Sequence, residues 1–290
     1  MIINLTSKNP LPPANQGSDF SIGKVILAAA GPGDPDLITV KAVRWLERAE
    51  VVLADRLVSE TILHRYVNSR AEIVRVGKQG RRSASTPQAS INDLLVEHAR
   101  AGKLVVRLKG GDASVFSNIF DELSALVANR IPYEIVPGVT AALGAAAYAG
   151  IPLTARDYAS GIRLLTCYKS DLIQVSYWKE LAATGDTLVF YMSAEMLDQA
   201  VALLLEHGIS REKWIAVIEQ ATTPLQQVSA CSFADYREKL KGRLFLSPAL
   251  VIIGKVAALH ERFKWIKNSN SSEYYFSPIQ ETVLSAEPSV

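Results

Sequence analysis

Residues 24–35, Lys-Val-Ile-Leu-Ala-Ala-Ala-Gly-Pro-Gly-Asp-Pro, decide how this chain folds. The apolar run at 25–30 is typical of a buried strand. It ends at Gly31-Pro32-Gly33, and Asp34-Pro35 then supplies an N-cap acid and a proline at the first helical position. The apolar spacing predicts that this helix continues to Leu46. A strand, a glycine turn and a helix in succession form either an ordinary β–α connection or a ligand loop at the carboxyl end of a sheet.

The alternation of strand and helix continues through the first half of the chain. Strands are expected at residues 51–54, 72–76, 103–108 and 133–136, with helices near 59–66, after Thr86-Pro87 and over 121–128. Elements of these lengths in this order imply parallel pairing with right-handed crossovers. The fold class is therefore α/β.

A break at Pro137-Gly138 divides the chain. The second half is expected to hold strands near 162–166, 187–191, 214–218 and 249–253, with a small-residue helix at 140–148 and a longer one at 194–207. We therefore expect a flexible tail at 1–22, an N-terminal α/β domain at 23–137, a C-terminal α/β domain at 138–265 and a flexible tail at 266–290.

Composition excludes several classes of protein. The formal net charge of the 290 residues is only +2, which argues against nucleic acid as the main partner. Cys167, Cys231 and the four histidines show no metal-ligand or redox spacing, so we expect free thiols and no metal. The first residues lack a secretory pattern and no apolar run is long enough to span a bilayer, so a cytoplasmic protein is expected.

Glycines and charged side chains gather where the first four predicted strands end. These strand ends read Gly31-Pro32-Gly33-Asp34, Asp55-Arg56, Gly77-Lys78 and Lys109-Gly110-Gly111-Asp112. In a parallel sheet they all emerge at one edge, where glycines let the backbone approach a ligand. Each feature alone is compatible with a helix cap, an ion pair or a turn. Their joint occurrence predicts a ligand site.

Three familiar kinds of site are disfavoured. The 31–33 loop lacks the third glycine of a dinucleotide fingerprint. Pro32 also has no backbone N–H to donate a hydrogen bond to a pyrophosphate. No Gly-Lys-Ser/Thr phosphate loop is present in the sequence. A Gly-x-Ser-x-Gly nucleophile elbow is also missing from it.

A series of motifs over residues 24–260 resembles the tetrapyrrole methylases, in order and with similar spacing. The motifs are Gly-Pro-Gly-Asp-Pro at 31–35, Val-Val-Leu-Ala-Asp-Arg-Leu-Val-Ser at 51–59, Val-Gly-Lys at 76–78, Val-Arg-Leu-Lys-Gly-Gly-Asp at 106–112, Val-Pro-Gly-Val-Thr-Ala-Ala at 136–142, Tyr-Ala-Gly-Ile-Pro-Leu-Thr at 148–154 and Thr-Leu-Val-Phe-Tyr-Met at 187–192. The resemblance implies a parallel-sheet N-terminal domain, a mixed-sheet C-terminal domain and an active site in the cleft between them, usually in a homodimer.

The resemblance also implies S-adenosyl-methionine as methyl donor. For the members that match best, it implies C-methylation of two pyrrole rings of uroporphyrinogen III, giving precorrin-2 through precorrin-1 for siroheme or cobalamin biosynthesis. Carried over by motif, Asp55 is the expected proton acceptor and Lys78 the proton donor. The donor pocket is expected to contain Pro32, Gly110, Gly111, Asp112, Val115, Thr140, Ala141, Met192 and Ala221.

The acceptor of such a reaction carries many carboxylates and needs cationic partners. Candidates near the predicted strand ends and loops are Arg56, Arg81, Arg82, Lys109 and Arg156. The chain departs from the family pattern at 113–120, at Ala155 and at 166–168, where acceptor-facing glycines, an arginine and two histidines are replaced. Two alternatives therefore stay open: a methylase of this fold with a different precorrin acceptor, and a binding protein that has lost turnover.

Overall fold

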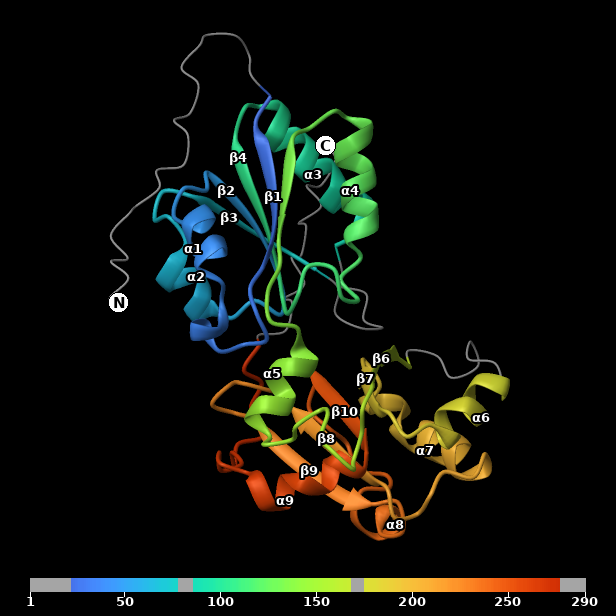
Figure 1. Ribbon diagram of the computed structural model, residues 1–290. Helices are drawn as coiled ribbons and strands as arrows, with labels where there is room; N and C mark the ends of the chain where they lie inside the picture. The colour runs from blue at the N-terminus through green and yellow to red at the C-terminus, as the bar shows by residue number, and fades with distance from the viewer. Residues whose placement is uncertain (1–21, 78–85, 168–174, 277–290) are drawn as a thin grey trace, which may run out of the picture.

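The computed structural model describes residues 22–77, 86–167 and 175–276. Two five-stranded sheets organise the chain, one in each half of the molecule (Figure 1). This arrangement confirms the predicted α/β fold, with a parallel first sheet and a mixed second sheet.

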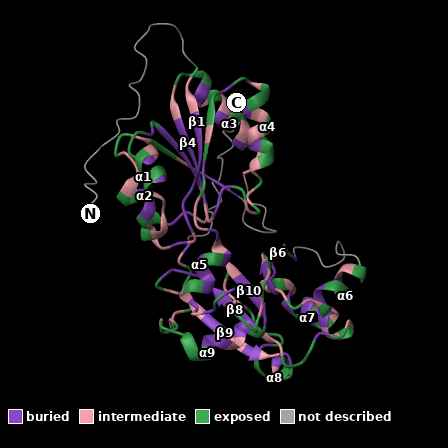
Figure 2. Ribbon diagram, in the orientation of Figure 1, coloured by how far each residue is buried: buried purple, intermediate pink, exposed green. Residues whose placement is uncertain are grey.

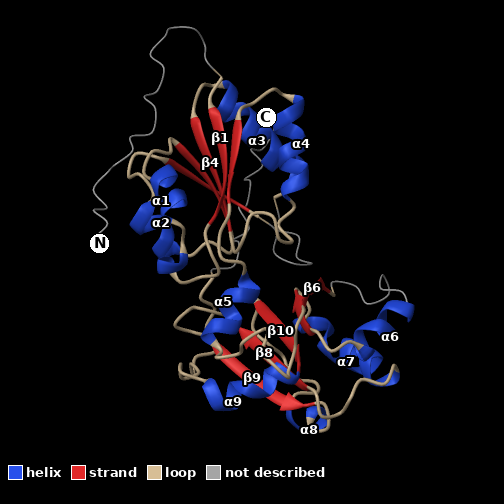
Figure 3. Cartoon of the chain, viewed as in Figure 1, coloured by secondary structure: helices blue, strands red, loops and turns tan. Residues whose placement is uncertain are grey.

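The first sheet has the strand order β3-β2-β4-β1-β5, and all its pairings are parallel. Its strands are β1 (Lys24–Ala29), β2 (Val51–Asp55), β3 (Glu72–Val76), β4 (Leu104–Lys109) and β5 (Tyr133–Val136). Helices α1 (Val40–Leu46) and α2 (Glu60–Tyr66) cover one face, and α3 (Gln88–Arg100) and α4 (Ile119–Ala128) cover the other (Figure 3).

The cover on both faces explains why β1 is apolar at every position after Lys24. Ile26 and Ala28 pack with the α1 and α2 side chains, whereas Val25 and Leu27 pack with those of α3 and α4. All four side chains are fully buried, and the centre of the sheet is purple in Figure 2. A strand that is buried on both faces needs an unbroken apolar run, which is the pattern at 25–30.

The helix predicted to run from Asp34 to Leu46 is instead divided into two. Asp34 caps a short 3-10 helix, η1 (Pro35–Leu37), after which Ile38 is extended. Thr39 then acts as a second N-cap, and its hydroxyl accepts a hydrogen bond from the amide of Ala42 at the start of α1. Thr39 is a good N-cap residue and so a possible signal for this break. The prediction missed it because the apolar spacing continues across Thr39 without interruption.

The second sheet has the order β6-β7-β10-β8-β9, with β6 and β7 parallel and the other neighbours antiparallel. Its strands are β6 (Ile162–Thr166), β7 (Thr187–Tyr191), β8 (Trp214–Glu219), β9 (Gln227–Ser232) and β10 (Ala249–Gly254). Among the described residues, the helices of this half are α5 (Ala141–Tyr148), α6 (Val175–Ala183), η3 (Ala194–Met196), α7 (Leu197–Glu206), α8 (Tyr236–Lys239), η4 (Lys255–Leu259) and α9 (His260–Phe263). Sequence reasoning did not identify β9, because this edge strand is only partly buried and therefore lacks an apolar run.

Helix α5 explains the run of small residues that follows the first sheet. Ala142, Ala145 and Ala146 are buried against the second sheet. A side chain at Gly144 would place its Cβ only 2.6 Å from Cγ of Pro32 in the first half. The helix can lie against both the second sheet and the 31–35 loop only because its side chains are small.

The predicted domain and tail boundaries agree with the structure to different extents. The first sheet ends at Val136, and the division at residue 137 stays a prediction. Residues 266–276 were expected in a flexible tail, but they make specific hydrogen bonds to the second sheet, for example from the Val228 amide of β9 to the Asn268 side chain. Residues 1–21 and 277–290 lie outside the described ranges. Within those ranges, none of the helices combines the length and apolar character that crossing a bilayer requires.

Candidate active site

The loops that follow β1 and β4 meet at the carboxyl edge of the first sheet. Gly31 and Gly111 form a backbone bridge with hydrogen bonds of 3.1 and 2.7 Å in the two directions. Gly111 has a left-handed backbone (φ 70°), and a Cβ placed on it would meet only the amide nitrogen of Ala141, at 3.7 Å. A Cβ at this position would therefore be in ordinary van der Waals contact with the start of α5. The left-handed backbone favours glycine, which adopts it without strain.

Asp112 stabilises this arrangement through hydrogen bonds to two segments. Its carboxylate accepts hydrogen bonds from the amide (2.8 Å) and hydroxyl (2.6 Å) of Ser114 and from the Gly138 amide (2.9 Å). Burial alone raises the pKa of this carboxyl group, but the hydrogen bonds outweigh it and lower the pKa. Asp112 thus ties the loop after β4 to the segment that leads into α5.

Two segments of the second half complete the same region. The Tyr191 hydroxyl lies 2.7 Å from the Thr140 hydroxyl, and it accepts a hydrogen bond from the Ala142 amide. Met192 follows with a left-handed backbone (φ 53°) and an exposed side chain. On the other side, a Cβ on Gly33 would lie 3.2 Å from the Ala221 carbonyl oxygen.

We call these converging residues the donor cradle. It consists of Gly31-Pro32-Gly33, Gly110-Gly111-Asp112, Thr140-Ala141, Met192 and Ala221. The structure therefore brings together the residues expected to bind the methyl donor, with the exception of Val115, which lines a neighbouring cavity together with Gly110. Glycines and backbone amides in this arrangement allow the backbone to approach a ligand closely.

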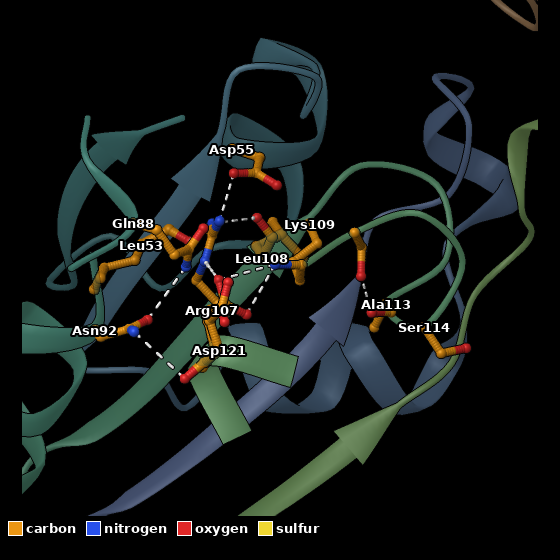
Figure 4. A network of polar contacts seen from close by, with 12 residues as sticks. Leu53, Asp55, Gln88, Asn92, Arg107, Leu108, Lys109, Ala113, Ser114 and Asp121 are labelled. Carbon is orange, nitrogen blue, oxygen red and sulfur yellow. Dashed lines mark hydrogen bonds and ion pairs between the residues drawn. The ribbon is translucent and has the colours of Figure 1, made fainter. Parts of the chain in front are cut away.

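A buried network of charges lies beside the cradle (Figure 4). The Arg107 guanidinium donates to Asp55 at 2.5 Å and to Glu122 at 2.9 Å, and it also contacts the carbonyl oxygen of Leu53. The Lys109 ammonium donates to both oxygens of Glu122, at 2.9 and 2.8 Å. Glu122 is fully buried. Of the four charged side chains in this network, only Asp55 is substantially exposed to solvent, with 26% of its side chain accessible.

The charges in this network shift one another's pKa. Burial by itself lowers the pKa of Arg107, but the carboxylates of Asp55 and Glu122 outweigh it and raise the pKa. For Lys109, burial and the adjacent Arg107 lower the pKa, and the carboxylates offset this only in part. Lys109 was expected to bind an acceptor, but its burial and its pairing with Glu122 favour a structural role.

A cavity of about 190 Å³ opens next to Asp55. Its lining includes Arg56, Gly77 and Phe116. The Nε of Arg56 is buried and has no hydrogen-bond partner in the described part of the chain. Burial also lowers the pKa of this guanidinium, against the effect of Asp55, which raises it. A guanidinium that lines a cavity and has one unsatisfied buried nitrogen is a candidate for binding an anionic group.

Four expected site residues are placed elsewhere or are not described. Arg156 lines a separate, larger cavity of about 850 Å³ formed by 154–160 with Gly185 and Asp186. Lys78, Arg81 and Arg82 lie outside the described residues. Among the residues with a defined position, no three His, Cys, Asp or Glu side chains form a possible metal-binding group.

Sequence reasoning missed Arg107, Glu122 and Tyr191. A signal was available for Arg107, because a charged residue inside the apolar strand 104–109 must find a buried partner. Glu122 stands one helical turn before Leu126 on the buried face of α4, which also marks it as an inward-facing charge.

The family described as Tetrapyrrole (Corrin/Porphyrin) Methylases matches residues 24–236. The chain belongs to the tetrapyrrole methylase family. Among curated relatives of this methylase is a siroheme synthase from Saccharophagus degradans, 44% identical over 245 residues that cover 84% of this chain and 53% of the relative. The chain thus spans about half the length of the curated relatives it matches.

Solved structures resemble this methylase over nearly their full length. Uroporphyrin-III-C-methyltransferase from Thermus thermophilus is 35% identical, with a TM-score of 0.69, covering 84% of this chain and 98% of that one. The same enzyme complexed with S-adenyl homocysteine gives a TM-score of 0.67 at 35% identity, covering 82% and 94% of the two chains. The two sheets and the region between them therefore correspond to the fold of a tetrapyrrole methylase.

Proposed function

We propose that this methylase transfers methyl groups from S-adenosyl-methionine to carbons on two pyrrole rings of uroporphyrinogen III, giving precorrin-2 through precorrin-1. The product would feed siroheme or cobalamin biosynthesis. The observation that carries the proposal is the donor cradle lying beside the Asp55–Arg107 pair at one edge of the first sheet. The names of the relatives and the S-adenyl homocysteine complex of the Thermus enzyme support it.

The donor cradle fits the proposed methyl donor. S-adenosyl-methionine would supply an electrophilic methyl group carried on a sulfonium. Gly111 has no side chain and Ala141 has only a methyl group, so the backbone is accessible here. Asp112 and Tyr191 hold the surrounding segments in place through hydrogen bonds. Alignment of two reactants accounts for up to about 7–11 kcal/mol of a barrier in favourable cases. Holding the donor rigidly is therefore the main task of these residues.

Asp55 is the proposed proton acceptor. Arg107 fixes one carboxylate oxygen at 2.5 Å, and Arg107 is itself held by Glu122. A carboxylate in this position can accept the proton of the attacked ring carbon or stabilise positive charge on the ring. Arg56 lines the cavity beside Asp55 and is proposed to bind a carboxylate of the acceptor. Lys78, Arg81, Arg82 and Arg156 keep their proposed roles as proton donor and further cationic partners.

The proposal is tested by anaerobic incubation of the protein with uroporphyrinogen III and methyl-labelled S-adenosyl-methionine, followed by mass analysis of the tetrapyrroles. We expect a gain of two methyl groups. The Asp55→Asn variant keeps an acceptor for Arg107 but loses the base, so its rate should fall by roughly 10²–10⁴-fold. The matched control is Asp93→Asn, which removes an exposed carboxylate on α3 and should keep the wild-type rate.

Each result decides between the proposal and its alternatives. A single added methyl would indicate an enzyme that stops at precorrin-1. Binding of S-adenosyl-homocysteine without transfer to uroporphyrinogen III would overturn the acceptor and leave another precorrin as the candidate. Cytoplasmic location and homodimeric assembly also belong to the proposal, and size-exclusion chromatography with light scattering measures the assembly.

A further inference from the structure

The last described part of the chain forms what we call the strap, residues 265–276. It runs beside β9, the edge strand of the second sheet (Figure 1). The Asn268 side chain pairs with both the amide and the carbonyl of Val228, at 2.8 and 2.9 Å. The side chain of Gln227 donates to the Ser271 carbonyl at 2.7 Å. The strap therefore satisfies backbone groups that an edge strand otherwise leaves unpaired.

Beyond β9 the buried side chain of Gln220 also holds the strap. Its amide nitrogen donates to the Glu273 carbonyl at 2.9 Å, and its amide oxygen accepts from the Tyr275 amide at 2.6 Å. Gln220 is fully buried and has a left-handed backbone (φ 48°). A non-glycine residue in this conformation persists only where its surroundings hold it.

Gln220 begins the loop 220–226, which contacts the first half of the molecule. The Thr222 hydroxyl accepts a hydrogen bond from the Asp34 amide at 3.1 Å. Thr222 also has a left-handed backbone, and its amide donates to the side chain of Gln226. A Cβ on Gly33 would lie 2.9 Å from Thr223. The position of this loop therefore sets the position of Asp34 and Gly33, next to Pro32 in the donor cradle.

The strap reaches Asp34 by a second route. The Trp265 ring nitrogen donates to the Ala147 carbonyl at 2.9 Å, and the ring packs edge-on against Tyr148 with 5.5 Å between centroids. The Tyr148 hydroxyl donates to the Asp34 carboxylate at 2.5 Å. Both routes end on one residue of the 31–35 loop. The strap thus holds that loop through Gln220 on one side and through Trp265 on the other.

We propose that Gln220 is a positioning residue for the donor cradle and that the strap fixes it in place. The proposal rests on the proposed function, because the cradle is assigned there to S-adenosyl-methionine. Gln220 acts through Ala221 and Thr222 and is not a catalytic residue. The loop faces the donor in the ground state and the transition state alike, so its loss raises KM for the donor and leaves kcat near its wild-type value.

The test compares Gln220→Met with Gln227→Met in the full chain. Both variants exchange the same side chain and remove bonds to the strap, but only Gln220 belongs to the 220–226 loop. Amide hydrogen exchange of residues 221–225 reports loop order without any ligand. Titration calorimetry with S-adenosyl-homocysteine reports donor binding.

We expect faster exchange at 221–225 in Gln220→Met alone, together with an increase of about tenfold in Kd for S-adenosyl-homocysteine. Unchanged exchange, or equal effects of the two variants, would overturn the positioning role and leave the strap as a cover for β9. If the wild-type protein does not bind S-adenosyl-homocysteine, the proposed function fails, whereas the exchange rates still decide whether Gln220 holds the loop.

Discussion

Replacing Glu122 with glutamine tests the buried charge network most directly. Glu122 is fully buried and accepts three hydrogen bonds from two cations, Arg107 and Lys109. A glutamine at this position would keep the shape of the side chain, but among the described residues it would leave the two buried cations with Asp55 as their one remaining paired carboxylate. Removing one member of a buried ion pair costs about 3–5 kcal/mol. That loss is large beside the roughly 5–15 kcal/mol by which most domains are stable.

Urea unfolding followed by tryptophan fluorescence measures the difference in unfolding free energy between the wild type and Glu122→Gln. The matched control is Asp121→Asn, which removes the same charge from an exposed position one residue earlier in α4 and should cost about 1 kcal/mol or less. The double variant Glu122→Gln with Lys109→Met restores charge balance and should be more stable than Glu122→Gln alone. The ionic account of the network would be refuted if Glu122→Gln cost no more than the control, or if the double variant recovered nothing.

Three further predictions concern other parts of the molecule. Partial burial raises the pKa of Glu134, but hydrogen bonds from lysines, Lys24 among them, outweigh it and lower the pKa from 4.5 to about 2. Its stabilising contribution is therefore present above pH 4.5 and lost as the pH falls toward 2, so Glu134→Gln should flatten the pH dependence of the unfolding free energy in that window; an unchanged slope would contradict this. Burial raises the pKa of Cys231 to about 11, so its thiol should react with Ellman's reagent at about pH 8 only after unfolding, and rapid reaction of the folded protein would count against it. A Cβ on Gly138 would lie 2.6 Å from that of Ala29, so Gly138→Ala should lower the unfolding free energy by about 1–3 kcal/mol and weaken binding of S-adenosyl-homocysteine, whereas wild-type stability would show that the contact relaxes freely.

The local sequence is sufficient to predict most strands of this protein. Strands such as Glu72–Val76 and Thr187–Tyr191 have the predicted bounds, because short apolar and β-branched runs between turn residues are encoded locally. Parallel pairing in the first half also follows from chain order, since short alternating strands and helices leave few other topologies. The gathering of Asp55 and Gly110 at one edge is a consequence of that pairing.

Local sequence was insufficient where a residue depends on a distant partner. The edge strand Gln227–Ser232 is half-exposed, and its outer groups are satisfied by Asn268 from the strap. The polar run at 267–272 indicates a tail, yet the side chains of Gln220 and Gln227 hold the strap through hydrogen bonds to its backbone. Composition alone does not predict such bonds.

The α/β fold, the family and the segments that could form a site all follow from the amino-acid sequence. Which of those side chains are available for chemistry depends on the folded arrangement. Lys109 and Asp55 both stand at strand ends, but Glu122 occupies the first, whereas Arg107 leaves the second partly exposed. The physical reason is that the energy of a charge depends on its burial and its partners. Those partners come from elements far apart in the chain and meet only after folding.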